Sequence, residues 1–256
     1  MSAQPADMPA GGLPDIFPSI GASALHALVA DMNKAGVGVL KGCMAPSALD
    51  GLRRLARSAL AKSAGDYAGL SGSDGGAGTA LDALSQSPAF QSLMRRIYEE
   101  GMDGAPAPEP DFHQVLRCIT PRSSQTHSLH FHYDSFVVTA LVPVEIPAAG
   151  RSGDFLMFPN TRRVRSLYLA NLLDKTLVDN RLSQVLLRLS ARRGWFGLVR
   201  FKPVPGDVYF FWGYRSIHTN EPCSSGAMRV TALYHYADPH VDSSIKRRLR
   251  AGIRPG

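Results

Sequence analysis

The sequence changes character near its middle, and this change limits the folds that the chain can adopt. After the Pro-rich stretch 105–110, apolar residues gather in short β-branched and aromatic runs, which Gly- and Pro-containing turns separate. Runs of this length and composition are typical of buried strands. We therefore expect strands at residues 112–120, 137–144, 155–158, 197–202, 208–212 and 228–236.

Helical spacing of apolar residues dominates the first part of the chain. We expect helices at residues 23–32, 46–62 and 88–100, with a short strand at residues 35–40. Leucines at helical spacing return at residues 166–193, between two of the expected strands. This pattern predicts an α+β protein with a mainly β core, a double-stranded β-helix (jelly roll) with N-terminal helices and a helical insertion.

The length of 256 residues and the hydrophobic content of 45% suffice for one domain with a sizeable core. The Gly- and Ser-rich residues 65–79 have no periodicity, and we expect a mobile loop there. The expected organisation is a disordered leader (1–22), a single domain (23–240) with helical support (23–104), a jelly-roll core (111–240) and a helical insertion (166–193), and a basic tail (241–256).

Several features of the sequence argue against a membrane or secreted protein. It has no apolar run of 18 residues, and its first residues lack the basic and apolar regions of a signal peptide. Cys43, Cys118 and Cys223 are widely spaced and odd in number, which argues against a disulfide framework or a structural zinc site. We therefore expect a cytoplasmic protein.

The net charge of +7 is unevenly distributed. Residues 151–202 contain eleven Lys and Arg but only three acidic residues. Such a surface attracts anionic partners such as nucleic acid, acidic lipid or a phosphorylated substrate, although a merely solvated cationic surface is the simpler interpretation. We expect the insertion, together with the Gly-rich loop 65–79, to cover the barrel mouth and to select an anionic or carrier-linked substrate. The arginines expected near the opening are Arg162, Arg163, Arg165, Arg181 and Arg188.

Two residues in the stretch LHFHYDSF, His132 and Asp134, stand two positions apart. On an extended strand such residues point to the same face, so the imidazole and the carboxylate can converge. One more imidazole would complete the two-His-one-carboxylate triad that holds Fe(II) and leaves positions open for O2 and a co-substrate. The same spacing also fits a polar strand end or a turn.

A candidate third ligand, His218, follows the aromatic run 208–212, and Arg229 comes eleven residues later. Antiparallel neighbours can place this imidazole and this guanidinium on one wall. The planar fork of Arg229 suits the far carboxylate of a dicarboxylic acid whose other end chelates iron. Thr231 lies on the same strand face and could donate its hydroxyl to that carboxylate.

Six stretches in order, one of them residues 137–147, give the chain a family resemblance over roughly residues 30–239. They are MNKAGVGVLKGCMAPSALDGLRRLAR, HYD, VVTALVPVEIP, SGDFLMFPNTRR, PGDVYFFWGYRSIHTNEP and RVTALYHY. Together they resemble the non-haem Fe(II)/2-oxoglutarate oxygenases, and within them the phytanoyl-CoA dioxygenase-like group. Two departures concern the substrate more than the metal: PNTRR replaces a Gly-Ser-His turn, and the insertion is unusually helical and basic.

The resemblance implies a set of site residues. His132, Asp134 and His218 would bind Fe(II), and Arg229 would hold the co-substrate 2-oxoglutarate. Gln114 and Asn220 stand about where the family places amides that touch 2-oxoglutarate. Among the other histidines, we expect His130 to lie beside a ligand, to face the substrate or to pack, and His235 to line the barrel.

The resemblance also implies a reaction. It is hydroxylation of an unactivated C–H bond in a small-molecule or carrier-linked substrate, with consumption of O2 and release of succinate and CO2. Asp134 favours hydroxylation over halogenation, because halogenases of the family have a small residue there. The alternative is a cupin-like metal-dependent isomerase, or a non-catalytic binding module with a basic surface that faces nucleic acid; we do not expect nucleic acid as the partner.

Overall fold

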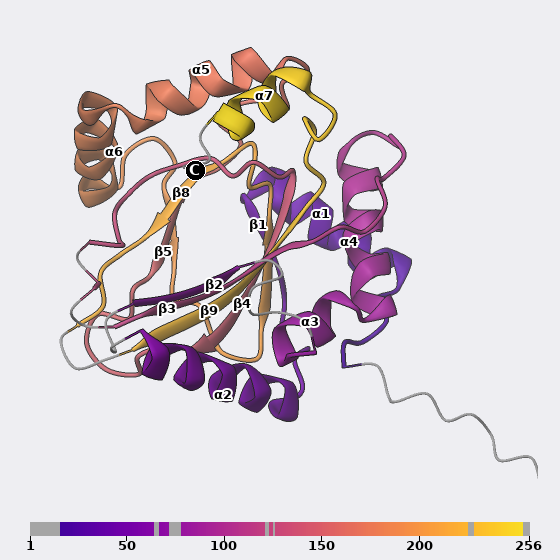
Figure 1. Ribbon diagram of the computed structural model, residues 1–256, viewed down its shortest axis with the longest axis vertical. Coiled ribbons are helices and arrows are strands. Elements are labelled where there is room, and N and C mark those ends of the chain that lie inside the picture. Colours follow the sequence, from indigo (N-terminus) through magenta and orange to yellow (C-terminus); the bar gives the residue numbers. More distant parts are fainter. Residues whose placement is uncertain are drawn as a thin grey trace, which may run out of the picture.

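The structure is a computed structural model, and it describes residues 16–63, 67–71, 78–120, 123–124, 126–224 and 228–252. Two antiparallel sheets form its centre (Figure 1). The larger sheet has the strand order β1 (Val37–Leu40), β7 (Val208–Phe211), β4 (Val138–Glu145), β9 (Arg229–Tyr236), β3 (His113–Ile119) and β2 (Tyr67–Ser71). The smaller sheet has the order β6 (Val199–Phe201), β5 (Phe155–Phe158) and β8 (Ile217–Asn220).

These elements confirm the strands that the sequence predicts after the Pro-rich stretch. Strand β4 lies between β7 and β9, and all but one of its residues are buried, as its β-branched composition indicates. Strand β5 begins and ends where the pattern predicts. The mixed helix and sheet content, with a six-stranded antiparallel sheet, agrees with the α+β expectation.

The stretch around His132 departs from the regular strand that its spacing suggests. His132 forms a single antiparallel bridge with His218, and their backbone N–H groups donate to each other's carbonyl at 3.1 and 3.0 Å. Two residues later, the N–H of Asp134 donates to the carbonyl of Gly213 at 3.0 Å. The segment therefore stops pairing with β8 after His132, and Asp134 pairs instead with the turn between β7 and β8.

The N-terminal helices pack beside and beneath the six-stranded sheet. Ser87 caps α4 by accepting from the N–H of Phe90 at 3.2 Å, and Pro88 is its first residue, which confirms the predicted break. Helix α2 lies under the sheet in Figure 1 and contacts β2, β3, β4 and β9. The helices are α1 (Ala22–Lys34), α2 (Pro46–Lys62), α3 (Ala80–Ser85) and α4 (Pro88–Gly101).

Two regions that we expected to lack structure contain some. Within the predicted loop 65–79, residues 67–71 form β2, because they find open backbone partners on β3; residues 64–66 and 72–77 lie outside the described residues. In the predicted leader, Phe17 is buried against Phe90, while residues 1–15 lie outside the described part. The predicted basic tail, which carried no expectation about structure, contains helix α7 (Ser244–Gly252), and Lys246 pairs with Asp238; residues 253–256 lie outside the described part.

The insertion forms two helices, α5 (Tyr168–Asp179) and α6 (Arg181–Arg193). The chain breaks at Asn180, whose extended backbone ends α5 and whose side chain accepts from the N–H of Ser183 at 3.0 Å. In Figure 1 both helices lie with α7 on the side of the molecule opposite α2. Of the helices in the described ranges, none combines the length and apolarity that crossing a membrane requires.

Candidate metal centre

The structure brings His132, Asp134 and His218 together. One ligand atom from each lies within 4.8 Å of the others. The Nε2 atoms of His132 and His218 lie 3.8 and 3.5 Å from Oδ1 of Asp134. These separations are longer than good N–H···O hydrogen bonds, yet all three atoms face one point.

The other nitrogen of each imidazole is held by the backbone. Nδ1 of His132 lies 3.1 Å from the carbonyl oxygen of His130, and Nδ1 of His218 lies 3.1 Å from that of Ser216. A carbonyl can only accept, so each Nδ1 donates, which leaves Nε2 as the ring nitrogen that is available to a metal. Two imidazole Nε2 atoms and one carboxylate oxygen that face one point form a donor set typical of a divalent metal site, so this arrangement fits such an ion.

The carboxylate of Asp134 is fixed by contacts on its far oxygen. Thr139 donates its hydroxyl to Oδ2 at 2.6 Å, and Nδ1 of His235 lies 3.4 Å from the same oxygen. Thr139 and His235 face each other across β4 and β9, and their side chains meet at 3.0 Å. Oδ1 is therefore left for the metal, while Oδ2 is held by its neighbours.

The protonation of this cluster follows from its surroundings. Burial alone raises the pKa of Asp134, but the charges and hydrogen bonds of His218 and His235 outweigh it and hold that pKa well below its ordinary value. Removal from water, together with the nearby His218, lowers the pKa of His132 below its ordinary value. Both shifts favour an ionised carboxylate and a neutral imidazole, which are the forms that bind metal.

Gly213 is a residue of this site that sequence reasoning missed. A Cβ atom built on Gly213 would overlap Oδ2 of Asp134 and the hydroxyl of Thr139. The backbone carbonyl of Gly213 also accepts from the N–H of Asp134. Only a residue without a side chain lets the β7–β8 turn approach the carboxylate this closely.

We expect Gly213→Ala to weaken metal binding. The added methyl group must displace the carboxylate of Asp134 or the hydroxyl that orients it, so affinity should fall by about 10- to 100-fold. Titration of the protein with Co(II), followed by its visible absorbance, measures this affinity. Gly21→Ala is the matched control, since nothing lies within 4 Å of a Cβ atom there. Equal Co(II) affinity in the two variants would contradict this role of Gly213.

A cavity of about 80 Å³ lies beside the triad. Arg229 reaches into it from β9, and its side chain is 2% exposed. Its Nη1 lies 3.4 Å from the hydroxyl of Thr231, while its Nε has no hydrogen-bond partner. Within the described ranges no carboxylate comes within ion-pair distance of Arg229. Burial and the nearby Arg117 lower the pKa of Arg229 to about 10.

Of the two amides that we expected at this cavity, only Asn220 lines it. Asn220 lines the cavity, accepts from Nη1 of Arg117 at 3.2 Å and donates to the hydroxyl of Ser128 at 2.9 Å. Gln114 does not reach it, because its amide donates to Ser85 of α3 at 2.7 Å. On β3, Gln114 and Arg117 are an odd number of residues apart, so they point to opposite faces of the sheet. Arg117 lines the cavity in place of Gln114.

A wider cleft of about 470 Å³ opens next to the cavity. His132 and Arg117 line both spaces, so the cleft leads to the metal centre. Helix α5 supplies Lys175 and Asp179 to the cleft wall. The other lining residues are Tyr67, Val115, His130 and Tyr133.

Contrary to our expectation, the arginines of the insertion and of the turn before it do not line this cleft. Arg162 is buried between the rings of Tyr133 and Tyr214 and pairs with Asp174 at 3.0 Å. Arg165 pairs with the same carboxylate at 2.7 Å, and Arg188 donates to the carbonyl of Leu129 at 2.9 Å. These groups hold the insertion to the rest of the chain, because the helix that carries Asp174 folds back over them. Arg163 and Arg181 are exposed outside the cleft lining.

Helix α6 also supports the strand segment that carries His132. The amide of Gln184 is buried; its Oε1 accepts from the N–H of Phe131 at 3.0 Å, and its Nε2 donates to the carbonyl of Phe131 at 2.8 Å. Sequence reasoning gave no sign of this contact, because Gln184 lies among leucines on an expected surface helix.

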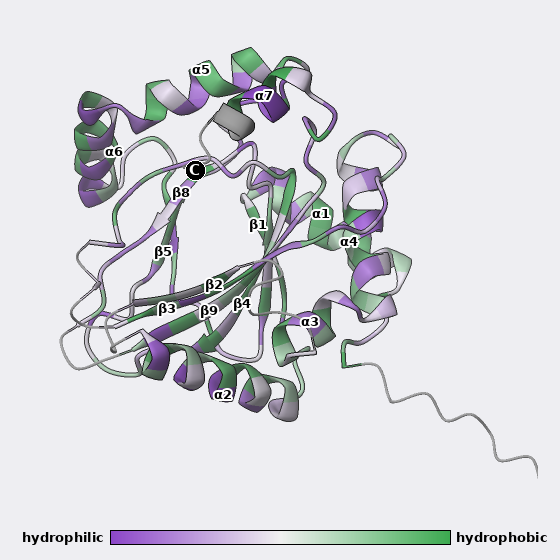
Figure 2. Cartoon of the chain, in the orientation of Figure 1, coloured by the Kyte–Doolittle hydropathy of each residue, from purple (hydrophilic) through white to green (hydrophobic). Residues whose placement is uncertain are grey.

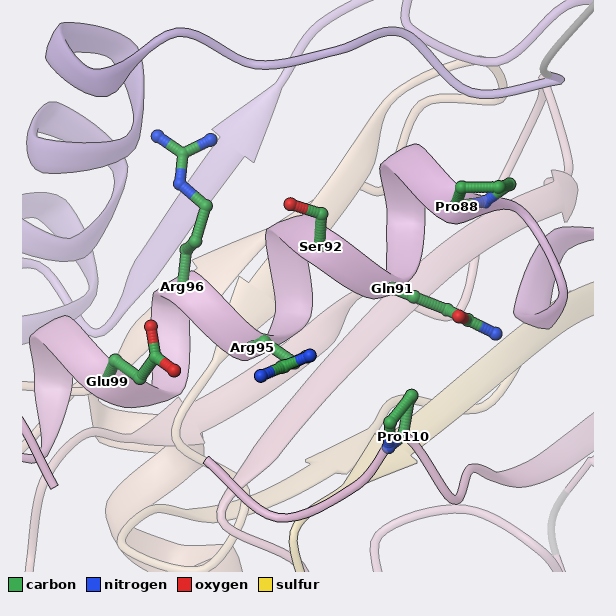
Figure 3. A pocket seen from close by; sticks show the side chains of 7 residues that line it. All are labelled: Pro88, Gln91, Ser92, Arg95, Arg96, Glu99 and Pro110. Carbon is green, nitrogen blue, oxygen red and sulfur yellow. The ribbon is translucent and has the colours of Figure 1, made fainter. Parts of the chain in front are cut away.

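A separate hollow, of about 320 Å³, lies over α4 (Figure 3). It is lined by polar residues of that helix and by Pro110. Nη1 of Arg96 donates to the carbonyl of Ile20 at 2.6 Å. No residue of the triad or of the adjoining cavity lines this hollow, so it is separate from the metal centre.

Comparison by sequence gives no relatives. No family model matches the chain, and no curated protein matches it.

Comparison by structure does give similar proteins. The epimerase SnoN from nogalamycin biosynthesis, in complex with Fe3+, alpha ketoglutarate and nogalamycin RO, is 16% identical with a TM-score of 0.55, over 85% of each chain. A prolyl-4-hydroxylase from Pseudomonas putida is 14% identical with a TM-score of 0.52, over 83% of this chain and 98% of its own. A Trichoplax adhaerens prolyl hydroxylase, bound to a hypoxia inducible factor peptide, is 13% identical with a TM-score of 0.52, over 91% and 94%. At these identities the likeness establishes a shared fold with prolyl hydroxylases and an alpha ketoglutarate dependent epimerase.

Proposed function

We propose that this protein is a non-haem oxygenase that uses Fe(II), 2-oxoglutarate and O2. The observation that carries the proposal is the convergence of two imidazole Nε2 atoms and one carboxylate oxygen beside a buried Arg229 that has no described carboxylate partner. A triad of this kind suits Fe(II), and a buried guanidinium suits the far carboxylate of a dicarboxylic acid. The shared fold with an alpha ketoglutarate dependent epimerase supports the proposal.

The residues of the chain divide the work as follows. His132, Asp134 and His218 hold the iron, and Thr139 with His235 keeps the carboxylate turned toward it. When bound, iron and 2-oxoglutarate supply the oxidation of a C–H bond by O2, with release of succinate and CO2.

The co-substrate is held by residues of the cavity beside the triad. Arg229 and Thr231 bind the far carboxylate of 2-oxoglutarate, and Arg117 and Asn220 form the neighbouring wall. Gln114 has no part in this assignment, because its amide is bound to Ser85.

The strand order supports a double-stranded β-helix for this chain. In the smaller sheet, the segment at His132 adds a fourth member beside β8. In the larger sheet, β7, β4, β9 and β3 form a continuous set that faces it across the cavity. This is the core that the sequence resemblance to the phytanoyl-CoA dioxygenase-like group implies, with helices at its N-terminus and an insertion between β5 and β6.

The reaction that we propose is hydroxylation of a small-molecule or carrier-linked substrate in the cleft beside His132. Asp134 occupies the ligand position that halogenation would need for chloride. Arg117 and Lys175 in the cleft wall favour a substrate with an anionic group.

The test is succinate release in the presence of Fe(II), ascorbate, 2-oxoglutarate and O2. We expect slow release without added substrate, and a screen of small molecules and carrier-linked compounds should find one that accelerates it. His132→Ala should abolish release, whereas His130→Ala, a matched change two residues away, should retain it. Metal-dependent isomerisation without consumption of 2-oxoglutarate, or salt-sensitive nucleic-acid retention without turnover, would refute the oxygenase.

A further inference from the structure

Helix α5 turns its apolar side away from the protein. The side that faces the protein carries polar groups: Asn171 is buried and accepts from Nη2 of Arg162 at 3.0 Å, and Asp174 pairs with Arg162 and Arg165. On the opposite side, Leu173 is 60% exposed, and it shares that side with Leu169, Leu172 and Leu177. An amphipathic helix on a protein surface ordinarily has the reverse orientation.

Helix α6 repeats this inversion. Its buried side carries Gln184, which is fully engaged by backbone groups of Phe131 and Val178. Its outer side carries Leu182, which is 69% exposed, together with exposed Val185 and Leu186. Val178, Leu187 and Ala191 also pack on the protein, but polar contacts supply much of the inner side of both helices, and most of their large apolar side chains lie in water.

We call the resulting surface the leucine face. It holds ten of the fourteen exposed large hydrophobic residues of the described chain: Leu167, Leu169, Leu172, Leu173, Leu177, Leu182, Val185, Leu186, Trp195 and Phe196. Figure 2 shows the hydrophobic segments of α5 and α6 at the rim of the molecule, away from the larger sheet. Single exposed leucines are ordinary, but so many on two contacting helices indicate an interaction surface for a protein or a membrane.

The charge around the leucine face is positive. The helices themselves carry two acidic residues; Asp174 is paired with two arginines, and Asp179 lies 3.5 Å from His130. Helix α7 adds exposed Ile245 beside the N-terminal end of α5. Exposed cations outnumber exposed Asp242 in this region; they are Arg163, Arg181, Arg192, Arg193, Arg247 and Arg248.

We propose that the leucine face docks onto an anionic membrane surface. Helices that present leucines and an aromatic tip within a border of arginines have the chemistry of an interfacial membrane anchor. A second copy of the chain is a poor occupant, because pairing two leucine faces would bring their arginine borders together. Phe196 is 81% exposed at the end of α6, and Arg193 lies over the ring of Trp195, an arrangement that suits the headgroup region.

Tryptophan emission can report this docking in the full chain, because the chain has two tryptophans in opposite settings. Trp212 is buried and donates to Asn33 at 2.9 Å, whereas Trp195 is exposed on the leucine face. We expect vesicles of phosphatidylglycerol and phosphatidylcholine to shift the emission to the blue and to carry the protein on flotation. Pure phosphatidylcholine vesicles should do neither, and high salt should release the protein.

Substitutions on the leucine face separate its apolar and cationic parts. Leu173→Ser with Leu186→Ser should lower partition into anionic vesicles by at least about tenfold. Arg181→Gln and Arg192→Gln should each lower it by about fivefold. Val204→Ser and Arg57→Gln are matched controls, because they change an exposed apolar residue and an exposed cation outside the face and should leave partition unchanged.

Three results would overturn the proposal. One is an unchanged Trp195 emission with anionic vesicles, and another is equal partition of the double-serine variant and the wild type. The third is a stable dimer of the wild type that the same variant dissociates in sedimentation velocity, which would assign the face to a second copy. The substituted side chains are exposed, so all variants should keep the thermal unfolding midpoint of the wild type.

Discussion

Asp134→Ala should give a folded protein that neither retains Fe(II) nor releases succinate from 2-oxoglutarate. The carboxylate is the anionic member of the triad, and its Oδ1 lies 3.5 and 3.8 Å from the two Nε2 atoms. Loss of groups that merely orient a ligand costs about 10- to 100-fold in affinity or activity, so loss of the ligand itself should exceed 100-fold. Calorimetric titration with Fe(II) under anaerobic conditions and a succinate assay measure the two effects.

A neighbouring acid provides the control for this experiment. Asp179→Asn also removes a carboxylate from the cleft, but Asp179 faces His130 rather than the triad, and the variant should keep Fe(II) binding and the slow succinate release that needs no added substrate. Asp134→Asn tests the charge separately, since it preserves the shape while removing the anion. Full succinate release by Asp134→Ala would remove this residue from the metal site and with it the proposed function.

Arg229→Lys should raise the KM for 2-oxoglutarate by about 10- to 100-fold and leave Fe(II) affinity unchanged. Lysine retains the charge but loses the planar fork that can bind a carboxylate through two hydrogen bonds, each of which contributes about 1.5–3 kcal/mol when charged. Arg200→Lys is the matched control, because Arg200 pairs with Glu221 and does not line the cavity. An unchanged KM in Arg229→Lys would transfer the role to Arg117.

Arg229 should lower the stability of the folded protein when 2-oxoglutarate is absent, although it is needed to bind 2-oxoglutarate. A buried guanidinium whose Nε has no partner destabilises the protein on its own, so Arg229→Met should raise the unfolding midpoint without 2-oxoglutarate. Added 2-oxoglutarate should stabilise the wild type but not this variant. A variant that is more stable yet inactive would identify Arg229 as a residue kept for binding.

The fold could largely be predicted from the sequence because its strands are marked by local composition. Strand β5 and the Ser87–Pro88 start of α4 depend on residues that are neighbours in the chain, and the structure has them where the pattern indicates. Strand β2 was missed because Tyr67–Ser71 has a central glycine and no β-branched residue; it exists through its pairing with β3. The gathering of His132, Asp134 and His218 was foreseen, whereas the contacts that orient them depend on how β4, β7 and β9 meet.

The remaining differences between prediction and structure concern the direction in which side chains point. Periodicity correctly indicated that α5 and α6 are amphipathic, but it cannot tell which side faces the protein, and both are inverted. The family resemblance assigns Gln114 to the co-substrate, but its side chain points to the other face of β3 and donates to Ser85. Arg162 was taken for a surface charge because its partners, Asn171 and Asp174, come from a helix that begins after it.

The two hydrogen bonds between Gln184 and Phe131 have a consequence for the edge of the smaller sheet. His132 uses its backbone groups to pair with β8, so the N–H and C=O of Phe131 point outward, as on any terminal strand. Open groups of this kind are a template on which another chain can add a strand and begin to aggregate. The amide of Gln184 supplies one donor and one acceptor, as a single residue of a further strand would. The metal-bearing edge is thus closed by a side chain, and the insertion that supplies it cannot be shortened past α6 without reopening that edge.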